Sequence, residues 1–278
     1  MIDDHMPESW QALQDGVKRI FRNIGLSAEV EVDIVTPRGS VNIDVVAVDL
    51  RSVDQIKYLV ECKNWGSAIP QHVVHSFTTI MHETGANIGF IISKNGLQSG
   101  AERYTQSTNI TGMTYLEFQK RYFAVWWKRY FCPRIGDAAD RPLQYVEECN
   151  GHRDKAYAGL SPDKQQEFDK LRRTYMAAIM VFSMFNVSTL SDCFGTSKID
   201  TPPADLESFK KDILALIAPC ITWHCSTFRG LLELILKFLT DVEEQFNALF
   251  GEYIFNLEPI SMVTEDGPPL HDRWAKRI

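Results

Sequence analysis

The hydrophobic pattern of this sequence changes at about residue 122, and the change limits the folds that the chain can adopt. From about residue 8 to 122, short runs of β-branched residues alternate with segments in which apolar residues recur every three or four positions. That rhythm is typical of a mixed α/β sheet. After about residue 130 only the helical spacing persists. We therefore expect an α/β domain over residues 1–122 and an all-helical domain over residues 123–278.

The first 122 residues predict a helix, three strands, a helix, a strand, a helix and a strand, in that order. Gly25 should end the first helix, and the turn at 37–40 should join the first two strands into a hairpin. The strand at 88–92 is so apolar that we expect it to be central and covered on both faces. The expected ranges are 10–24, 28–34, 41–48, 56–62, 70–83, 88–92, 99–106 and 111–116.

The second half of the sequence predicts helices over 162–185, 205–217 and 227–250, because apolar residues recur there at spacings of three and four. No motif in this half indicates a function. A homo-oligomeric contact or a partner protein is a role that such a helical domain could serve.

The net charge of the chain is −7, and residues 1–122 hold 11 basic against 14 acidic side chains. A phosphate backbone would be repelled by this total, so any DNA affinity would need local basic patches. The N-terminus is acidic where a secretory signal needs basic residues, and no apolar run is long enough to cross a bilayer. We expect a cytoplasmic protein with no membrane contact.

Three charged residues stand inside or at the end of otherwise apolar strands. Asp44 interrupts the strand at 41–48, while Glu61 and Lys63 end the strand at 56–62. Residues two apart on a strand point to the same face, so Glu61 and Lys63 share one side and Cys62 faces the other. Charges in such places cost folding free energy unless they pair or bind an ion.

Phosphodiester hydrolysis would explain these charges. The carboxylates of Asp44 and Glu61 could hold Mg²⁺, with the backbone carbonyl of Cys62 as a third ligand. Lys63 would then position the attacking water or stabilise charge on the phosphate. By itself an Asp followed by a Glu-x-Lys is a weak signal, and an exposed strand end with a Glu–Lys surface pair is the alternative.

Several pieces in order strengthen the catalytic interpretation. The opening helix ends at Gly25, Val-Asn-Ile-Asp-Val-Val-Ala carries Asp44, and Glu-Cys-Lys-Asn-Trp occupies 61–65. A buried strand in Gly-Ala-Asn-Ile-Gly-Phe-Ile-Ile-Ser, a helix with Ala101 and a closing Ile-Thr-Gly-Met-Thr-Tyr-Leu follow. In these features the stretch from Leu13 to Phe118 resembles the PD-(D/E)xK nuclease superfamily, and within it the Mrr-type restriction endonuclease catalytic domain.

The resemblance implies a restriction-endonuclease-like αβββαβ core with a mixed sheet, and DNA cleavage that depends on Mg²⁺ or Mn²⁺. Many members carry a Glu on the first helix that supports the metal, but this sequence has Gln14 there, and a neutral amide is a poor metal ligand. Glu31 could substitute, although a solvated strand face is the alternative. Gln71 begins the helix where members of the family often place a polar residue facing the site.

Basic and aromatic residues interleave after the last strand. Lys120, Arg121, Lys128 and Arg129 alternate with rings between 122 and 131. Cations and rings could bind phosphates and stack on bases. A helix that joins two domains, with buried rings and outward cations, would show the same pattern and is the interpretation that we favour.

We therefore expect a Mg²⁺-dependent DNA endonuclease, used in restriction or anti-phage defence. One alternative keeps the fold but assigns DNA repair or branched-DNA processing. Another makes the chain a regulatory or binding module whose latent nuclease is activated by a partner at the helical domain.

Overall fold

The structure is a computed structural model that describes residues 1–186, 201–217, 224–255 and 263–268. Contacts divide the chain into two compact units. The first contains Asp3–Trp126 and the described residues 265–268, and the second contains the described residues between 127 and 264. The boundary expected after residue 122 falls inside a helix that belongs to the first unit through Trp126. In the residues that the structure describes, no helix is long and apolar enough to cross a membrane.

The first unit has the predicted element order. Its five strands form one sheet in the order β1-β2-β3-β4-β5, in which β1, β2 and β3 are antiparallel neighbours while β3, β4 and β5 are parallel. The expected αβββαβ core with a mixed sheet is confirmed. Its elements are α1 (Trp10–Asn23), β1 (Ser27–Thr36), β2 (Gly39–Asp49), β3 (Ile56–Lys63), α2 (Gln71–Thr84), β4 (Ile88–Ser93), α3 (Ser99–Thr105), β5 (Ile110–Thr114) and α4 (Tyr115–Trp126).

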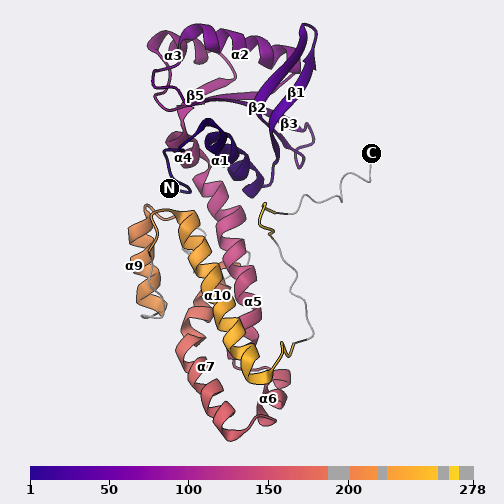
Figure 1. Cartoon of the computed structure of the whole chain (residues 1–278), viewed down its shortest axis with the longest axis vertical. Coiled ribbons are helices and arrows are strands. Elements are labelled where there is room, and N and C mark those ends of the chain that lie inside the picture. The colour runs from indigo at the N-terminus through magenta and orange to yellow at the C-terminus, as the bar shows by residue number, and fades with distance from the viewer. Residues whose placement is uncertain (187–200, 218–223, 256–262, 269–278) are drawn as a thin grey trace. The chain divides into compact units, whose positions relative to one another are not determined.

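Helices cover both faces of this sheet, with α2 and α3 on one face and α1 and α4 on the other (Figure 1). On the α2 face, Leu59 and Ile91 of the sheet pack in one cluster with Phe77 of the helix. On the other face, the ring of Phe118 meets those of Phe21 and Phe90 edge to face. The sheet is therefore the middle layer of a three-layer unit.

The strand β4 is central and buried on both faces, as its composition predicted. Gly89 shows how tightly α2 packs against it, because a Cβ there would lie 2.9 Å from both Met81 Sδ and a ring carbon of Phe77. Only a glycine lets the helix approach this closely.

The predicted end of the last strand is wrong. The last strand was expected to reach residue 116, but it ends at Thr114 and α4 begins at Tyr115. Thr114 and Glu117 form a reciprocal cap: Glu117 N donates to Thr114 Oγ1 at 3.2 Å, and Thr114 N donates to Glu117 Oε2 at 2.7 Å. This Thr-x-x-Glu capping box starts a helix although Tyr115 and Leu116 continue the apolar pattern of the strand.

The described part of the second unit is mainly helical, as the sequence predicted, although α5 and α6 lie outside the predicted ranges. It contains η1 (Trp127–Phe131), α5 (Cys132–Val146), α6 (Gly151–Ala158), α7 (Pro162–Ser183), η2 (Met184–Asn186), α9 (Leu206–Ile217) and α10 (Phe228–Phe250). In Figure 1, α5, α7 and α10 run alongside one another. Aromatic rings fill the space between them, for example Tyr145 stacked on Phe246 with centroids 4.9 Å apart.

Candidate active site

Asp44 lies at the point where β2 and β3 separate. The ladder between these strands runs from Asp49 paired with Ile56 to Val45 paired with Val60, and Asp44 comes next along β2. Its Oδ2 accepts a hydrogen bond of 2.6 Å from the backbone N of Cys62. The Asp44 carboxylate thus binds the backbone of β3 just beyond the last paired residues. This bond holds it next to Cys62, between Glu61 and Lys63.

Glu61 and Lys63 lie on the same face of β3, while Cys62 between them is buried. The Nζ of Lys63 forms an ion pair with Oε1 of Glu61, and the two side chains are 23% and 18% exposed. The structure therefore brings Asp44, Glu61 and Lys63 together at one sheet edge. The surface Glu–Lys pair that the sequence left open as an alternative does not describe these largely covered side chains.

The electrostatics of this group show an excess of negative charge. Burial raises the pKa of Glu61, and the nearby carboxylate of Asp44 raises it further, against the opposing effect of Lys63. Burial alone would lower the pKa of Lys63, but its hydrogen bond to Glu61 and the charges of Glu61 and Asp44 outweigh burial, so its pKa is raised. Lys63 therefore stays charged at neutral pH, and an added cation would relieve the repulsion between the carboxylates.

Gln14 and Glu31 complete the group. The amide Nε2 of Gln14, which is 3% exposed, donates to Oε1 of Glu31 at 2.6 Å and to Oδ1 of Asp44 at 3.0 Å. Both hydrogens of one neutral amide are thus used to bridge two carboxylates that would otherwise repel each other. The sequence placed both residues near the site only as accessory candidates, and the structure shows the contact through which they could act.

The backbone of Glu31 is unusual and was not predicted. The pairs Val30–Val45 and Val32–Ile43 flank Glu31 and Asp44 in the hairpin, but Glu31 and Asp44 do not pair in the ladder. Glu31 has a φ of 52°, in the left-handed region that a residue with a side chain seldom adopts. Such backbone strain tends to occur at functional sites, where the surrounding structure holds it.

The donor set fits a hard divalent cation. Three carboxylates face one ammonium group and one neutral amide, and each oxygen of Asp44 uses only one lone pair in the hydrogen bonds described above. Within the described ranges, no three His, Cys, Asp or Glu side chains form a group that could hold a metal ion by themselves. An ion at Asp44 and Glu61 would need further oxygens from water, from substrate or from the Cys62 carbonyl, as is usual for Mg²⁺.

The Cys62 thiol has no place in this chemistry. Complete burial raises its pKa well above the ordinary value, and the carboxylates of Asp44 and Glu61 act in the same direction. The thiol therefore stays protonated, and it is neither a nucleophile nor a thiolate ligand.

Gln71 makes its described side-chain contact with another residue of its own helix. It is the first residue of α2, and its Nε2 is 3.2 Å from Nε2 of His75 one turn later. Its amide makes no hydrogen bond to Asp44, Glu61 or Lys63, so the accessory role expected for it rests on its position at the helix start alone.

The basic and aromatic residues after β5 divide between the two units. Lys120 and Arg121 are exposed on α4, and Lys128 and Arg129 are exposed on η1. The rings of Trp126, Trp127 and Phe131 are fully buried. These rings cannot stack on bases, so the arrangement agrees with the favoured interpretation, in which the rings face inward and the cations outward.

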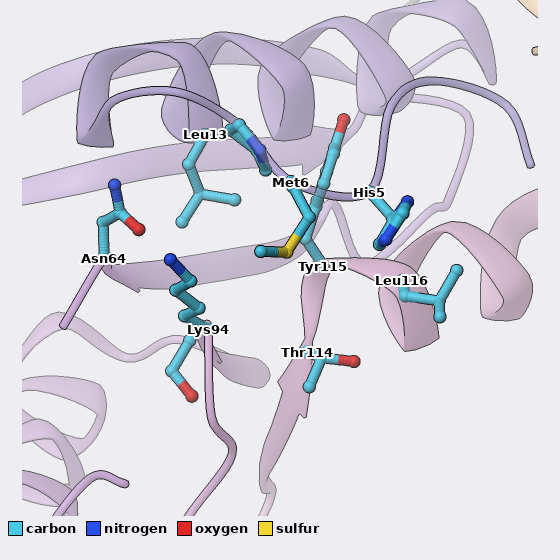
Figure 2. A pocket seen from close by; sticks show the side chains of 10 residues that line it. His5, Met6, Leu13, Asn64, Lys94, Thr114, Tyr115 and Leu116 are labelled. Carbon is cyan, nitrogen blue, oxygen red and sulfur yellow. The ribbon is translucent and has the colours of Figure 1, made fainter. Parts of the chain in front are cut away.

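The structure contains a pocket that the sequence did not predict (Figure 2). Two of its lining residues adjoin Lys63: Asn64 follows it in the chain, and Ser93 is its partner in the ladder. Its volume is about 170 Å³. We call it the edge pocket, because its walls come from the carboxyl ends of the parallel strands, from α1 and from the N-terminal segment. The residues that define it here are Met6, Leu13, Asn64, Lys94, Tyr115 and Leu116.

Comparison with known proteins agrees with the geometry. Residues 7–121 match the family model of the restriction endonuclease catalytic domain of the Mrr type. The first unit therefore resembles a restriction endonuclease catalytic domain, and the resemblance stated for residues 13–118 is confirmed. No curated protein matches the chain. Among solved structures, the chain is similar to the crystal structure of AF1548, a protein of unknown function, with 17% identity over 60% of this chain and 97% of that chain, and a TM-score of 0.34.

Proposed function

We propose that this restriction-endonuclease-like domain cleaves phosphodiester bonds within DNA, using Mg²⁺ or Mn²⁺, and that it serves restriction or anti-phage defence. The observation that carries the proposal is the meeting of Asp44, Glu61 and Lys63 at one sheet edge, in the domain that matches the nuclease family. Asp44 and Glu61, with the backbone carbonyl of Cys62, would hold the ion.

A divalent ion bound there would stabilise negative charge on the phosphate and lower the pKa of a water molecule in its shell. The residues of the chain orient the metal ligands and the reacting groups. Asp44 is oriented by Cys62 N and Gln14, so its carboxylate needs little rearrangement on binding. Lys63, charged at neutral pH, can orient the attacking water and donate to a phosphate oxygen as charge develops on it.

DNA must approach a chain with a net charge of −7. We propose that exposed cations supply the local attraction, with Lys120 and Arg121 on α4 and Lys128 and Arg129 on η1 as candidates. Such contacts to phosphate are independent of base sequence and weaken as salt is added. A second copy or a partner protein at the helical unit would be a further source of affinity.

The direct test is incubation of the full chain with plasmid DNA in Mg²⁺ and in Mn²⁺. We expect cleavage by the wild type, and a loss on the order of a thousandfold for Lys63→Ala, because that variant lacks the cation next to the reacting phosphate. Lys155→Ala is the matched control, since Lys155 is exposed on α6 in the second unit.

Plasmid left intact in both metals, or equal cleavage by Lys63→Ala, would contradict the proposal. The same assay on four-way junctions, flaps and linear duplex separates the defence role from repair. Preference for branched DNA would assign the nuclease to repair or junction processing instead.

A further inference from the structure

We propose that the edge pocket receives one base of the DNA substrate, turned out of the double helix next to the bond to be cut. The inference rests on the proposed nuclease function, and it adds a substrate contact that the metal and phosphate chemistry does not require. Four observations carry it: the position of the pocket, its walls, its unused polar groups and its rigid construction.

The pocket adjoins the catalytic group through neighbouring residues in the chain and in the sheet. Asn64 directly follows Lys63, and Ser93, which also lines the pocket, is the β4 partner of Lys63 in the parallel ladder. Leu13 precedes Gln14 on α1. A nucleotide whose phosphate lies against Lys63 would therefore have the mouth of this pocket within reach of its base.

The walls suit a flat apolar body. Met6, Leu13 and Leu116 contribute aliphatic or thioether surface, and Tyr115 adds an aromatic ring. Figure 2 shows the side chains of Leu13, Met6 and Lys94, which come from three separate segments, pointing toward one another around the cavity. A volume of about 170 Å³ matches one planar heterocycle rather than a folded peptide or a duplex.

Two polar side chains at the rim have unused hydrogen-bonding capacity. Asn64 and Lys94 are exposed, and neither side chain forms a hydrogen bond or ion pair with another described residue. An amide presents a donor and an acceptor side by side, as the edge of a base does. Lys94 can bind the phosphate on the far side of the same nucleotide. A purely apolar ligand would leave both groups unused.

The pocket is built before any ligand arrives. The segment that carries Met6 is held against the unit by Asp3, whose backbone N donates to Gln119 Oε1 at 2.8 Å and whose carboxylate pairs with Arg19 at 3.0 Å. The Gln119 side chain is fully buried and also donates to the carbonyl of Asp4 at 3.3 Å. Because these contacts already fix the wall, binding does not require the wall to become ordered. The free energy of binding can then offset the cost of unstacking the base.

The test uses a short duplex in which a single 2-aminopurine faces a mismatched base, because a mismatch makes extrusion easier. Without divalent metal, binding by the full chain is followed by anisotropy and unstacking by 2-aminopurine fluorescence. We expect a fluorescence rise on binding, and tighter binding than to the fully paired duplex.

Two substitutions place an added ring in the pocket. Leu116→Phe adds a ring from α4, and Met6→Trp does so from the exposed N-terminal segment, in case the first variant folds poorly. Each should abolish the fluorescence rise and weaken binding to the mismatched duplex roughly tenfold, the size of one lost stacking contact. Leu50→Phe is the matched control, because Leu50 is exposed at the turn between β2 and β3.

Binding without a fluorescence rise, a rise that persists in both variants, or no binding at all would overturn the pocket proposal. Plasmid cleavage in Mg²⁺, measured on the same preparations, tests the nuclease function separately. Cleavage without unstacking would leave the nuclease and reject the pocket. Pocket-dependent unstacking without cleavage would support the base site and reject the catalytic assignment.

Discussion

Arg153 in the second unit and Glu61 in the first are both covered charged residues, and their surroundings differ in how far they neutralise the charge. Arg153 is 3% exposed, and its guanidinium donates to the carbonyls of Glu147 and Glu148 and to the carboxylate of Asp154. Glu61 has one cation, Lys63, but two further carboxylates close enough to raise its pKa.

The difference separates a structural charge from a functional one. A buried arginine whose donors all meet oxygen atoms ties together the turn between α5 and α6, and nothing further is needed there. A carboxylate group with more negative than positive charge is stable only at a cost, which a bound cation would remove. Substitution of Arg153 should therefore lower stability, whereas substitution of Glu61 should lower the cleavage rate.

Exchanging each residue for a neutral one of similar size tests this contrast. Arg153→Met should lower the free energy of unfolding by about 3 kcal/mol, because the carbonyls of Glu147 and Glu148 and the carboxylate of Asp154 lose the donors of a buried guanidinium. Cleavage per folded molecule should stay at the wild-type level. Glu61→Gln should reduce cleavage on the order of a thousandfold, while the unfolding free energy changes little.

Urea unfolding and single-turnover cleavage, measured on both variants, give the four values needed. The contrast fails if Glu61→Gln destabilises the chain as much as Arg153→Met does. It also fails if Glu61→Gln cuts DNA at the wild-type rate.

Gln14 offers a smaller change that sharpens the same contrast. Gln14→Glu keeps the shape but removes both hydrogen bonds to Glu31 and Asp44 and adds a fourth carboxylate. Without metal the variant should melt at a lower temperature than the wild type, because like charges now meet in a covered place. Addition of Mg²⁺ should raise its melting temperature more than that of the wild type.

Gln14→Leu is the matched variant, since it loses the same bonds without adding charge. It should need roughly tenfold more Mg²⁺ for half-maximal cleavage, the usual effect of losing a residue that orients a metal ligand. Equal responses of all three proteins to Mg²⁺ would show that Gln14 does not act on the metal site.

Several of these features could be predicted from the sequence and others could not, for physical reasons. The alternation around Cys62 is a local property of an extended chain, so the shared face of Glu61 and Lys63 followed from spacing alone. The helices α7, α9 and α10 of the second unit followed from the spacing of their apolar residues, whereas α5 and α6 were not predicted. The resemblance to a nuclease family then gave Asp44 its place in the site.

The bridge from Gln14 to Glu31 and Asp44 depends on how α1 packs across the hairpin, and no local pattern encodes this packing. The wall of the edge pocket depends on a hydrogen bond between Asp3 and Gln119, which are 116 residues apart. The left-handed backbone of Glu31 has no sequence signal, since glycine or asparagine would be the usual marker. The capping box at Thr114 and Glu117 did have one, in the Thr-x-x-Glu spacing.

The smallest expected effect concerns Tyr122 on α4, a partly buried group that is neutral rather than charged. Burial raises the pKa of Tyr122 to about 12, with a further contribution from Tyr58. In the unfolded chain the phenol ionises near its ordinary value of about 10. Between these values the folded state holds a proton that the unfolded state has lost, so stability falls as the pH rises through this window.

Tyr122→Phe removes this titration. Between pH 8 and pH 11 the unfolding free energy of the wild type should fall by about 1 kcal/mol more than that of the variant. Urea unfolding at the two pH values measures the difference, and Tyr145→Phe tests the matching tyrosine of the second unit, whose pKa burial also raises. A wild-type pH dependence that Tyr122→Phe leaves unchanged would show that the phenol reaches solvent. In that case the contrast between covered groups would hold for the charged residues Arg153 and Glu61 but would not extend to the neutral Tyr122.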